Sequence, residues 1–309
     1  MLMKSIQNYY TPLLLGILLS MFFSKNIAQA QDLQPLMSQW MYNKLIYNPA
    51  YAGTNEGVSG SAVHRQQWIG FDKGRPITTT LSVDGAIKNQ KIGLGLNLLN
   101  DRYGNISRTD IMGNAAYKIQ LSDEMKLSMG LKFGVSNIRR NQVEVWDESD
   151  ATFLNSDRNQ AFLPRIGAGI YIDDPKFYAG ISAPDLYVQD KNNFFTTNTS
   201  WKAGKDYMAF AGYNLFINDM YTLLPAAMIK FSKTRTYAEL NLSVLYKDFF
   251  KAGLSYRSPY NTYAVITSFK LNDKLGAGIA YEFSPSSNKI ELPSLGSTFE
   301  LMLNYNLWQ

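Results

Sequence analysis

The amino-acid sequence predicts an all-β protein, a transmembrane antiparallel β-barrel of about 14 strands. Three observations predict it: an export signal at the N-terminus, a long series of segments in which apolar residues alternate with small or polar ones, and connections that alternate between short and long. We also expect an N-terminal aromatic segment, placed in the lumen of the barrel or at its periplasmic mouth.

Residues 1–30 have the three parts of a secretory signal peptide. Lys4 is basic, residues 13–23 are apolar, and Ala28-Gln29-Ala30 is a small-x-small cleavage site. The apolar run is shorter than the roughly 20 residues that a membrane-spanning helix needs. We therefore expect export, cleavage before Gln31, an N-terminal plug or periplasmic segment over 31–56, and an outer-membrane barrel over 57–309.

Composition excludes several classes of protein. The chain has no cysteine, so it uses neither disulfides nor a lipid anchor on a modified cysteine. The formal net charge is +5, and it falls to +3 when Lys4 and Lys25 leave with the signal peptide, which contains no Asp or Glu. This balance is too small to predict a nucleic-acid partner. The 20 tyrosines suit a membrane interface, where one end of the ring is apolar and the other is wet.

The aromatic segment at residues 40–53 lacks a clean two-residue alternation. Within it, Asn-Pro starts a turn, because proline disfavours the helical region for the residue before it. Its large aromatic side chains carry too much apolar area to be left in water. We expect contacts with the lumen from Trp40, Tyr42, Tyr47 and Tyr51. The alternative is that the segment is only a linker into the first strand.

From about residue 57 the sequence has a period of two. Leu127, Met129, Leu131 and Phe133 alternate with Ser128, Gly130, Lys132 and Gly134, and the pattern recurs at 92–99, 275–283 and 299–307. One face is apolar and the other is small or polar, over about ten residues. This length and alternation are typical of transmembrane strands whose apolar face meets lipid.

The pattern places strands near 57–67, 75–87, 91–100, 108–121, 125–138, 162–172, 176–184, 203–217, 220–232, 235–246, 249–257, 261–271, 274–284 and 297–308. Short connections, rich in turn residues, fall at 88–90, 122–124, 173–175, 218–219, 247–248 and 272–273. Successive connections in such a barrel alternate between its two ends, and the long connections at 101–107, 139–161, 185–202 and 285–296 all belong to the end opposite the short ones. With both termini periplasmic, the long connections are expected outside the cell.

Several motifs resemble the PorP/SprF family of outer-membrane proteins from bacteria with type IX secretion and gliding motility. They lie at 38–43, 48–53, 65–71, 76–84, 177–184 and 296–303, and the run Asn-Pro-Ala-Tyr-Ala-Gly at 48–53 is the most specific. The family often has a histidine next to the glutamate of the last motif, where this chain has Phe299 beside Glu300. The resemblance implies a barrel that works with the type IX machinery, often by attaching a particular secreted adhesin or surface protein.

The candidate site residues form two groups. The long connections carry Trp146, Phe153, Phe194, Phe195 and Trp201, which are possible anchors for a partner and alternatively pack on each other above the barrel. Near the end of the first strand, Arg65, Gln67 and Trp68 are expected to contact the aromatic segment or a bound chain. The alternative for Trp68 is a place in the aromatic girdle at the membrane interface.

The sequence offers little for catalysis, metal binding or cofactors. His64 is the only histidine, and no serine or aspartate motif supports a triad around it. The acidic residues at 144–157 lack the order of a calcium-binding loop, although calcium there stays an alternative. Glycine pairs such as Gly93 and Gly95 do not lead from a strand into a helix. They are therefore interpreted as strand glycines facing a crowded lumen, not as a nucleotide site.

We therefore expect a non-enzymatic barrel that anchors a secreted surface protein, or assists its export, through its extracellular loops and lumen. The expected partners are the C-terminal region of that protein, type IX components on the periplasmic side, and membrane lipid or lipopolysaccharide. The main alternative is a channel for small solutes, which an open lumen would favour. A third alternative, a barrel hydrolase, requires a nucleophile within hydrogen-bonding reach of His64.

Overall fold

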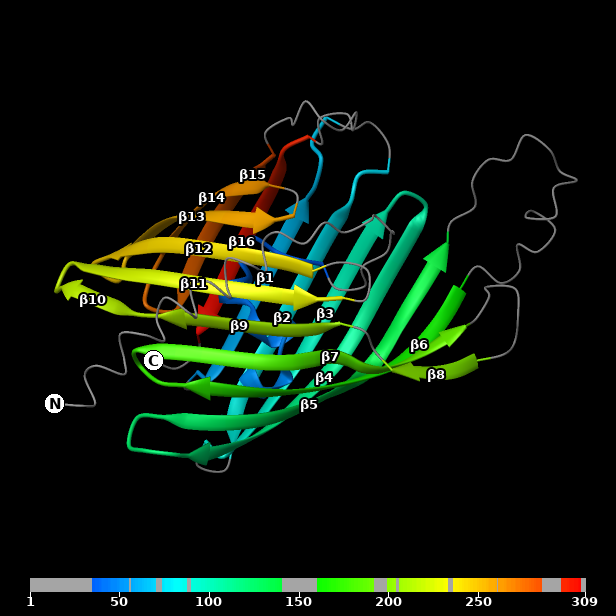
Figure 1. The fold of residues 1–309 in the computed structure, drawn as a ribbon, viewed down its shortest axis with the longest axis horizontal. Helices are drawn as coiled ribbons and strands as arrows, with labels where there is room; N and C mark the ends of the chain where they lie inside the picture. The colour runs from blue at the N-terminus through cyan, green and yellow to red at the C-terminus, as the bar shows by residue number, and fades with distance from the viewer. Residues whose placement is uncertain are drawn as a thin grey trace, which may run out of the picture.

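A computed structural model describes residues 35–55, 57–70, 74–87, 90–140, 160–191, 199–203, 206–232, 236–259, 261–284 and 296–306. They form a closed antiparallel β-barrel (Figure 1). The strands are β1 (Val58–Gln66), β2 (Ile77–Ile87), β3 (Ile92–Tyr103), β4 (Ile106–Gln120), β5 (Lys126–Arg140), β6 (Gln160–Asp173), β7 (Phe177–Lys191), β8 (Thr199–Ala203), β9 (Tyr207–Tyr213), β10 (Leu215–Asn218), β11 (Tyr221–Phe231), β12 (Thr236–Tyr246), β13 (Phe250–Ser258), β14 (Thr262–Lys270), β15 (Leu275–Phe283) and β16 (Thr298–Asn306).

Closure of the barrel depends on two contacts. Strand β16 pairs with β1, and β9 pairs with both β7 and β11. Strands β8, β9 and β10 follow one another along a single position in the wall. Strand β8 pairs with the C-terminal part of β7, and β10 pairs with the N-terminal end of β11. The 16 strands of the sheet therefore occupy about 14 positions around the barrel, an even number as in single-chain bacterial barrels.

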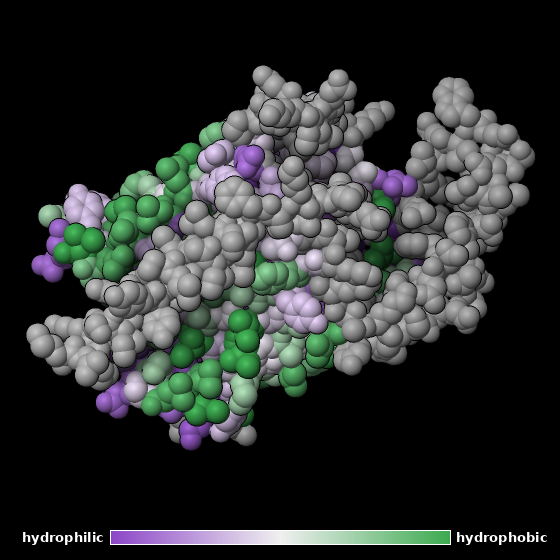
Figure 2. Space-filling view, in the orientation of Figure 1, coloured by the Kyte–Doolittle hydropathy of each residue, from purple (hydrophilic) through white to green (hydrophobic). Residues whose placement is uncertain are grey.

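The two faces of the wall have the predicted chemistry. Leu94 and Leu96 point outward and are each 47% exposed, whereas Asn97 and Lys132 are buried inside. Figure 2 shows hydrophobic side chains along the outside of the strands and hydrophilic ones at the left-hand tips, where the short connections lie. Backbone hydrogen bonds are satisfied between strands, which lipid requires.

No helix among the described residues is long and apolar enough to cross a membrane.

Two predicted connections are wrong in length. The expected long connection at 101–107 is a tight turn at Gly104, because Asp101 and Arg102 pair with Arg108 and Ser107. Most of the expected connection at 185–202 is also paired, since β7 runs to Lys191 and meets β8 there. In both places polar residues that resemble a loop belong to strands that continue past the apolar band.

The strands differ in length around the barrel. Strands β4, β5 and β7 have 15 residues and β6 has 14, whereas β13, β14, β15 and β16 have nine each. About 9–11 residues cross a bilayer. The β4–β7 side of the barrel is therefore long enough to extend several residues beyond the apolar core.

The described part of the N-terminal aromatic segment, residues 35–55, lies inside the barrel and is called the N-terminal segment below (Figure 1). It folds into three short 3-10 turns: η2 (Trp40–Tyr42), η3 (Lys44–Ile46) and η4 (Pro49–Tyr51). Turn η4 contacts β4, β5 and β6, and η3 contacts β2 and β3. The principal hydrophobic cluster thus joins this segment to the inner wall.

Candidate functional site

The candidate site is the interface between the N-terminal segment and the inner wall of the barrel. Its centre is Asn48, whose extended backbone is the conformation that the following proline favours. The Asn48 side-chain oxygen accepts a hydrogen bond from the Ala50 amide at 2.9 Å and caps η4. Pro49 occupies the first position of the turn, where no backbone N–H is needed.

The Asn48 amide also fixes the segment to the wall. Its Nδ2 donates to the carbonyl oxygens of Ile170 at 2.9 Å and Ile181 at 3.3 Å, on β6 and β7. Room for this side chain exists because Gly169 and Gly180 lie beside it, where a Cβ atom would overlap the Asn48 amide. Asn48 is fully buried, and this contact joins two strands through one side chain.

Wall glycines admit the backbone of the segment. A Cβ atom on Gly93 would overlap the Ala52 carbonyl, and one on Gly130 would overlap the Ala50 nitrogen. The run ends at Gly53, whose φ of 64° favours glycine and whose N–H donates to Asp84 at 2.7 Å. These contacts confirm the interpretation of the strand glycines as lumen-facing positions in a crowded interior.

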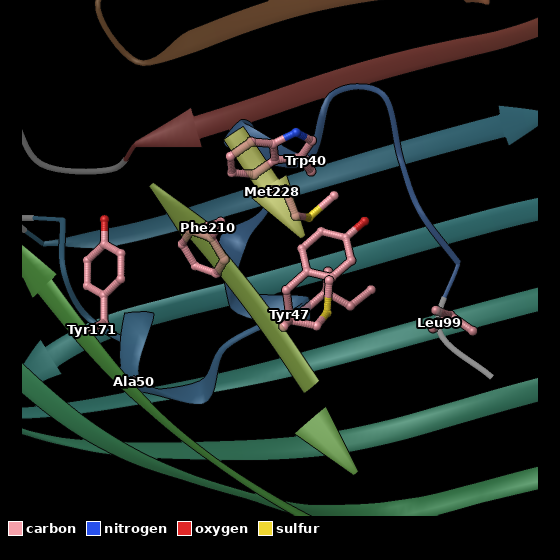
Figure 3. Packing of buried hydrophobic residues seen from close by; sticks show 9 residues of the cluster. Trp40, Tyr47, Ala50, Leu99, Tyr171, Phe210 and Met228 are labelled. Atoms are coloured by element: carbon pink, nitrogen blue, oxygen red, sulfur yellow. The ribbon is translucent and has the colours of Figure 1, made fainter. Parts of the chain in front are cut away.

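The predicted aromatic residues of the segment meet the wall in different ways. Trp40 and Tyr47 are fully buried, and Trp40 packs on Phe210 with ring centroids 5.7 Å apart (Figure 3). Tyr51 meets Tyr171 edge to face at 5.4 Å. The Tyr47 hydroxyl accepts from the Met37 N–H at 3.0 Å and donates to the Pro35 carbonyl at 3.2 Å, and burial raises the Tyr47 pKa.

Two lysines interact with tyrosine rings at this interface. The Lys44 ammonium lies 4.0 Å from the Tyr178 ring centroid, and the Lys251 ammonium lies 4.0 Å from that of Tyr42. Burial lowers the pKa of Lys44 to about 8, an effect that the nearby Asp173 opposes. The Tyr42 hydroxyl hydrogen-bonds to Ser268 on β14, but burial outweighs this bond and raises the Tyr42 pKa to about 12.

A buried charge network holds the start of the N-terminal segment. Arg65 is 1% exposed and pairs with Glu282 at 3.0 Å and with Glu300. Both carboxylates reach the segment: Glu300 accepts from the Ser38 N–H at 2.7 Å, and Glu282 accepts from the Ser38 hydroxyl at 2.6 Å. Arg65 therefore acts on the segment through these two glutamates, as well as donating to Ser38 directly at 3.3 Å.

The network continues along the wall. Arg257 pairs with Glu239 at 2.7 Å and with Glu282 at 3.3 Å. The sequence analysis named Arg65 but missed these partners. Glu239, Glu282 and Glu300 each occupy an inward position and are each the single acidic residue of their strand, and that pattern was the available signal.

A second charge network lies on the wall of β4, β6 and β7. Arg165 bridges Asp110, at 2.8 Å, and Asp185, and Asp110 also pairs with Arg108. Neighbouring Lys132 donates to the Ile46 carbonyl at 3.4 Å, which links this wall to η3. Paired charges of this kind stiffen the inner wall around the N-terminal segment.

The fit between segment and wall is not complete. Among the described residues, both polar atoms of the Gln39 side chain, the Trp40 indole nitrogen and the Asn43 side-chain oxygen are buried without a hydrogen-bond partner. Each such group costs roughly 1–3 kcal/mol. Docking of the segment therefore depends on its close contact with the wall glycines, on the aromatic contacts and on the Arg65 network.

The other predicted residues lie elsewhere. Gln67 and Trp68 follow the end of β1, where the Gln67 N–H donates to Pro76 at 2.9 Å and Trp68 has a φ of 57°. Trp201 belongs to β8, but its side chain is outside the described residues. The four other loop aromatics, Trp146, Phe153, Phe194 and Phe195, and the acidic residues at 144–157, are also outside them.

His64 points away from the lumen. Its Nδ1 hydrogen-bonds to the Thr79 hydroxyl at 2.9 Å and its Nε2 to the Gln66 amide at 3.1 Å. Among the described residues, no group of three or more His, Cys, Asp or Glu side chains is placed to hold a metal ion. The site is therefore a packed protein–protein interface within one chain.

Comparisons with known structures show the fold. The CymD monoaromatic hydrocarbon channel has 12% identity and a TM-score of 0.51, over 87% of this chain and 93% of that chain. The P. putida toluene transporter TodX has 10% identity and a TM-score of 0.49, over 85% and 93%. A Pseudomonas aeruginosa FadL homologue has 10% and 0.48, over 85% and 94%. At such identities the likeness extends to the outer-membrane barrel alone.

A comparison with curated protein sequences finds no match. A protein family does match, over residues 28–305, and it is described as type IX secretion system membrane protein PorP/SprF. The matched region contains the N-terminal segment and all the described strands except the last residue of β16, Asn306. The chain therefore belongs to the PorP/SprF family of type IX secretion system membrane proteins, as its motifs predicted.

Proposed function

We propose that the protein is a non-enzymatic outer-membrane barrel that anchors a type IX-secreted surface protein or adhesin, or assists its export, while its N-terminal segment acts as a plug. The observation that carries this proposal is the docking of that segment inside the barrel. Asn48 and the wall glycines seat one end, and the Arg65 network holds the other. A simple solute pore needs its lumen for water, and membership of a secretion family favours a protein partner.

The orientation is part of the proposal. We place both termini and the short connections in the periplasm and the long connections outside the cell, because every long connection has the same parity. The long strands β4–β7 support this, since their extra residues lie at the end that carries the connection 141–159. The short connections then face the periplasmic components of the type IX machinery.

Cysteine labelling on intact cells tests this orientation. Cysteines that replace Ser156 or Asn193 are expected to react with an impermeant reagent, and cysteines that replace Asp123 or Asp248 are not. Asp123 and Asp248 are exposed in short connections, so a lack of labelling there reflects sidedness and not burial. Labelling of these two positions from outside would reverse the orientation.

The partner is proposed to bind at the outer end. Trp146, Phe153, Phe194, Phe195 and Trp201 belong to the long connections or to their bordering strand, with polar residues around them. Aromatic anchors inside a polar rim are the usual composition of a protein interface. We propose that they capture the C-terminal region of one secreted surface protein, together with the upper lumen.

The test is the double substitution Phe194→Ala with Phe195→Ala, and separately Trp146→Ala. The variants are expected to insert and fold normally but to release one surface protein from the cells into the medium. Phe249→Ala is the matched control, because Phe249 is an aromatic residue, 57% exposed, in a short connection at the opposite end. Retention of every surface protein by the correctly folded double variant would refute the anchoring role.

A channel for small solutes is the second candidate, favoured by the barrel likeness to CymD, which is a monoaromatic hydrocarbon channel. Uptake measurements separate the two candidates. If the loop variants keep every surface protein but lose uptake of a small solute, the channel function replaces anchoring. If they lose the surface protein with uptake unchanged, anchoring stands.

A further inference from the structure

The outer surface of β1 to β6 carries a polar belt near the ends of the strands that carry the Gly104 turn and the connection 141–159. We define it by two rows of outward-facing residues. Each member lies directly opposite the next on the neighbouring strand. The first row is His64, Thr79, Asn100, Thr109 and Asn137, and it ends there because the residue opposite Asn137 on β6 is Phe162. The second row is Gln66, Ile77, Arg102, Ser107, Arg139 and Gln160.

Hydrogen bonds between strands organise the belt. Besides the His64–Thr79 bond, the Asn100 amide donates to the Thr109 hydroxyl at 2.9 Å. The Gln160 amide donates to the Asn137 side-chain oxygen, also at 2.9 Å. These bonds satisfy some of the polar groups of the rows and hold their side chains in a fixed arrangement. Arg102 and Arg139, in the second row, are exposed.

The belt directly follows the lipid-facing band. On β3 the outward side chains change from Leu94 and Leu96 to Arg102, and on β5 they change from Leu131 to Arg139. Since β4 and β5 have 15 residues and about 9–11 cross the apolar core, the belt falls at the level of the lipid headgroups.

The charge of the belt is of one sign. It contains two arginines and a histidine, and neither row contains an Asp or Glu. The belt also ends abruptly at the seam between β1 and β16. In the same registers, β16 and β15 present Leu301, Phe299, Ile279 and Tyr281. The polar, basic character is therefore a property of one side of the barrel and not of its whole rim.

We propose that the belt binds the phosphate-bearing headgroup of an outer-leaflet glycolipid such as lipopolysaccharide. Arg102 and Arg139 lie two strands apart, about 10 Å from backbone to backbone. Two guanidinium groups at that spacing contact phosphate groups of one large headgroup, because arginine binds phosphate through charge-assisted, often bidentate, hydrogen bonds. The amide and hydroxyl groups of both rows meet the sugar hydroxyls.

A lipid fits this surface better than a protein does. The belt is continuous with the lipid-facing leucines below it, so a molecule with an apolar tail and an anionic head matches both parts. A protein interface instead needs a cluster of aromatic anchors, whereas this surface offers only Ile77 and, on β6 at the end of the first row, Phe162. The assignment to the outer leaflet rests on the orientation proposed above.

The experiment compares the full barrel with Arg102→Gln plus Arg139→Gln, both in nanodiscs. The probes are diphosphorylated lipid A and its dephosphorylated form. Loss of two charge-assisted contacts is expected to weaken binding of the phosphorylated probe on the order of tenfold. The dephosphorylated probe is expected to bind wild type and variant equally. Lys176→Gln plus Lys274→Gln, which removes the same charge at the opposite rim, is expected to leave binding unchanged.

Equal affinity of wild type and the arginine variant for the phosphorylated probe would overturn the proposal. So would a protein that co-purifies with the wild-type barrel and is lost from the arginine variant while lipid binding persists. The titration in nanodiscs does not depend on sidedness in the cell. A reversed cysteine-labelling result would therefore contradict the orientation and the outer-leaflet source, but not the phosphate site itself.

Discussion

Gly93 and Gly130 set the closest approach between the N-terminal segment and the barrel wall. Both replace a side chain with the backbone of the segment, which packs directly on the strands. Neither glycine is needed for a turn, since both lie inside strands and neither has a positive φ. The lack of a side chain at these two positions leaves the space that the backbone of the segment occupies.

The substitution Gly130→Ala tests this close approach. A methyl group there would overlap the Ala50 backbone, which cannot yield as a flexible side chain can. We expect the barrel to remain folded while the N-terminal segment dissociates and becomes cleavable by trypsin after Lys44. Gly60→Ala is the control, because its Cβ would meet Val83 at 3.4 Å, an ordinary contact. If Lys44 is equally protected from trypsin in both variants, the close contact at Gly130 does not hold the segment.

Arg65 organises the charge network that holds the start of the N-terminal segment, at Ser38. Arg65→Met leaves Glu300 buried and without its arginine, and removing one partner of a buried ion pair typically costs about 3–5 kcal/mol. We expect a clear loss of stability in chemical unfolding of the detergent-solubilised barrel. Arg65→Met combined with Glu300→Met is expected to recover part of the loss. A double variant no more stable than the single one would mean that the ion pair is not the cause.

At the scale of elements, the strands were predictable because lipid and lumen demand opposite side chains at alternate positions. Strand β15 shows this, with Ile279 and Tyr281 outward and Ala280 and Glu282 inward. The prediction failed at 101–107 because Asp101 and Arg102 are polar strand residues beyond the apolar band. The alternation of apolar and polar residues disappears where a strand extends beyond the membrane, because both of its faces then meet water.

The N-terminal segment was predictable in its place but not in its contacts. The sequence at 48–53 predicts a proline turn, since Asn48 and Pro49 have local conformational preferences. It does not reveal that the Asn48 amide reaches β6 and β7, or that Glu282 and Glu300 hold Ser38. Those pairs are far apart in the chain, and only the closed barrel brings them together.

Deletion of residues 32–54 is expected to lower the melting temperature of the solubilised barrel. The deletion removes Trp40 and Tyr47, both fully buried, and each buried aromatic contributes roughly 2 kcal/mol or more. It also leaves Arg65, Glu282 and Glu300 without Ser38. An unchanged melting curve would mean that the segment is only a linker into β1.

At the scale of the whole molecule, the barrel combines a lipid-facing exterior with an interior built around its own N-terminal segment. The two charge networks lie on the inner wall, and residues 35–55 lie in the lumen between them. Under the proposed function, such a barrel uses its outer end, and not a permanent pore, for interaction. This agrees with a member of a secretion family whose fold is shared with channels.

The conductance of the purified barrel in a planar bilayer tests the central claim most directly. The wild-type protein is expected to be closed, because residues 35–55 occupy the lumen, and both the 32–54 deletion and Gly130→Ala are expected to conduct ions. Because one variant lacks the segment and the other keeps the whole chain, conductance in both indicates that the lumen has opened and not that the barrel has failed to fold. Steady conductance of the wild-type barrel, equal to that of both variants, would contradict the account and establish an open channel.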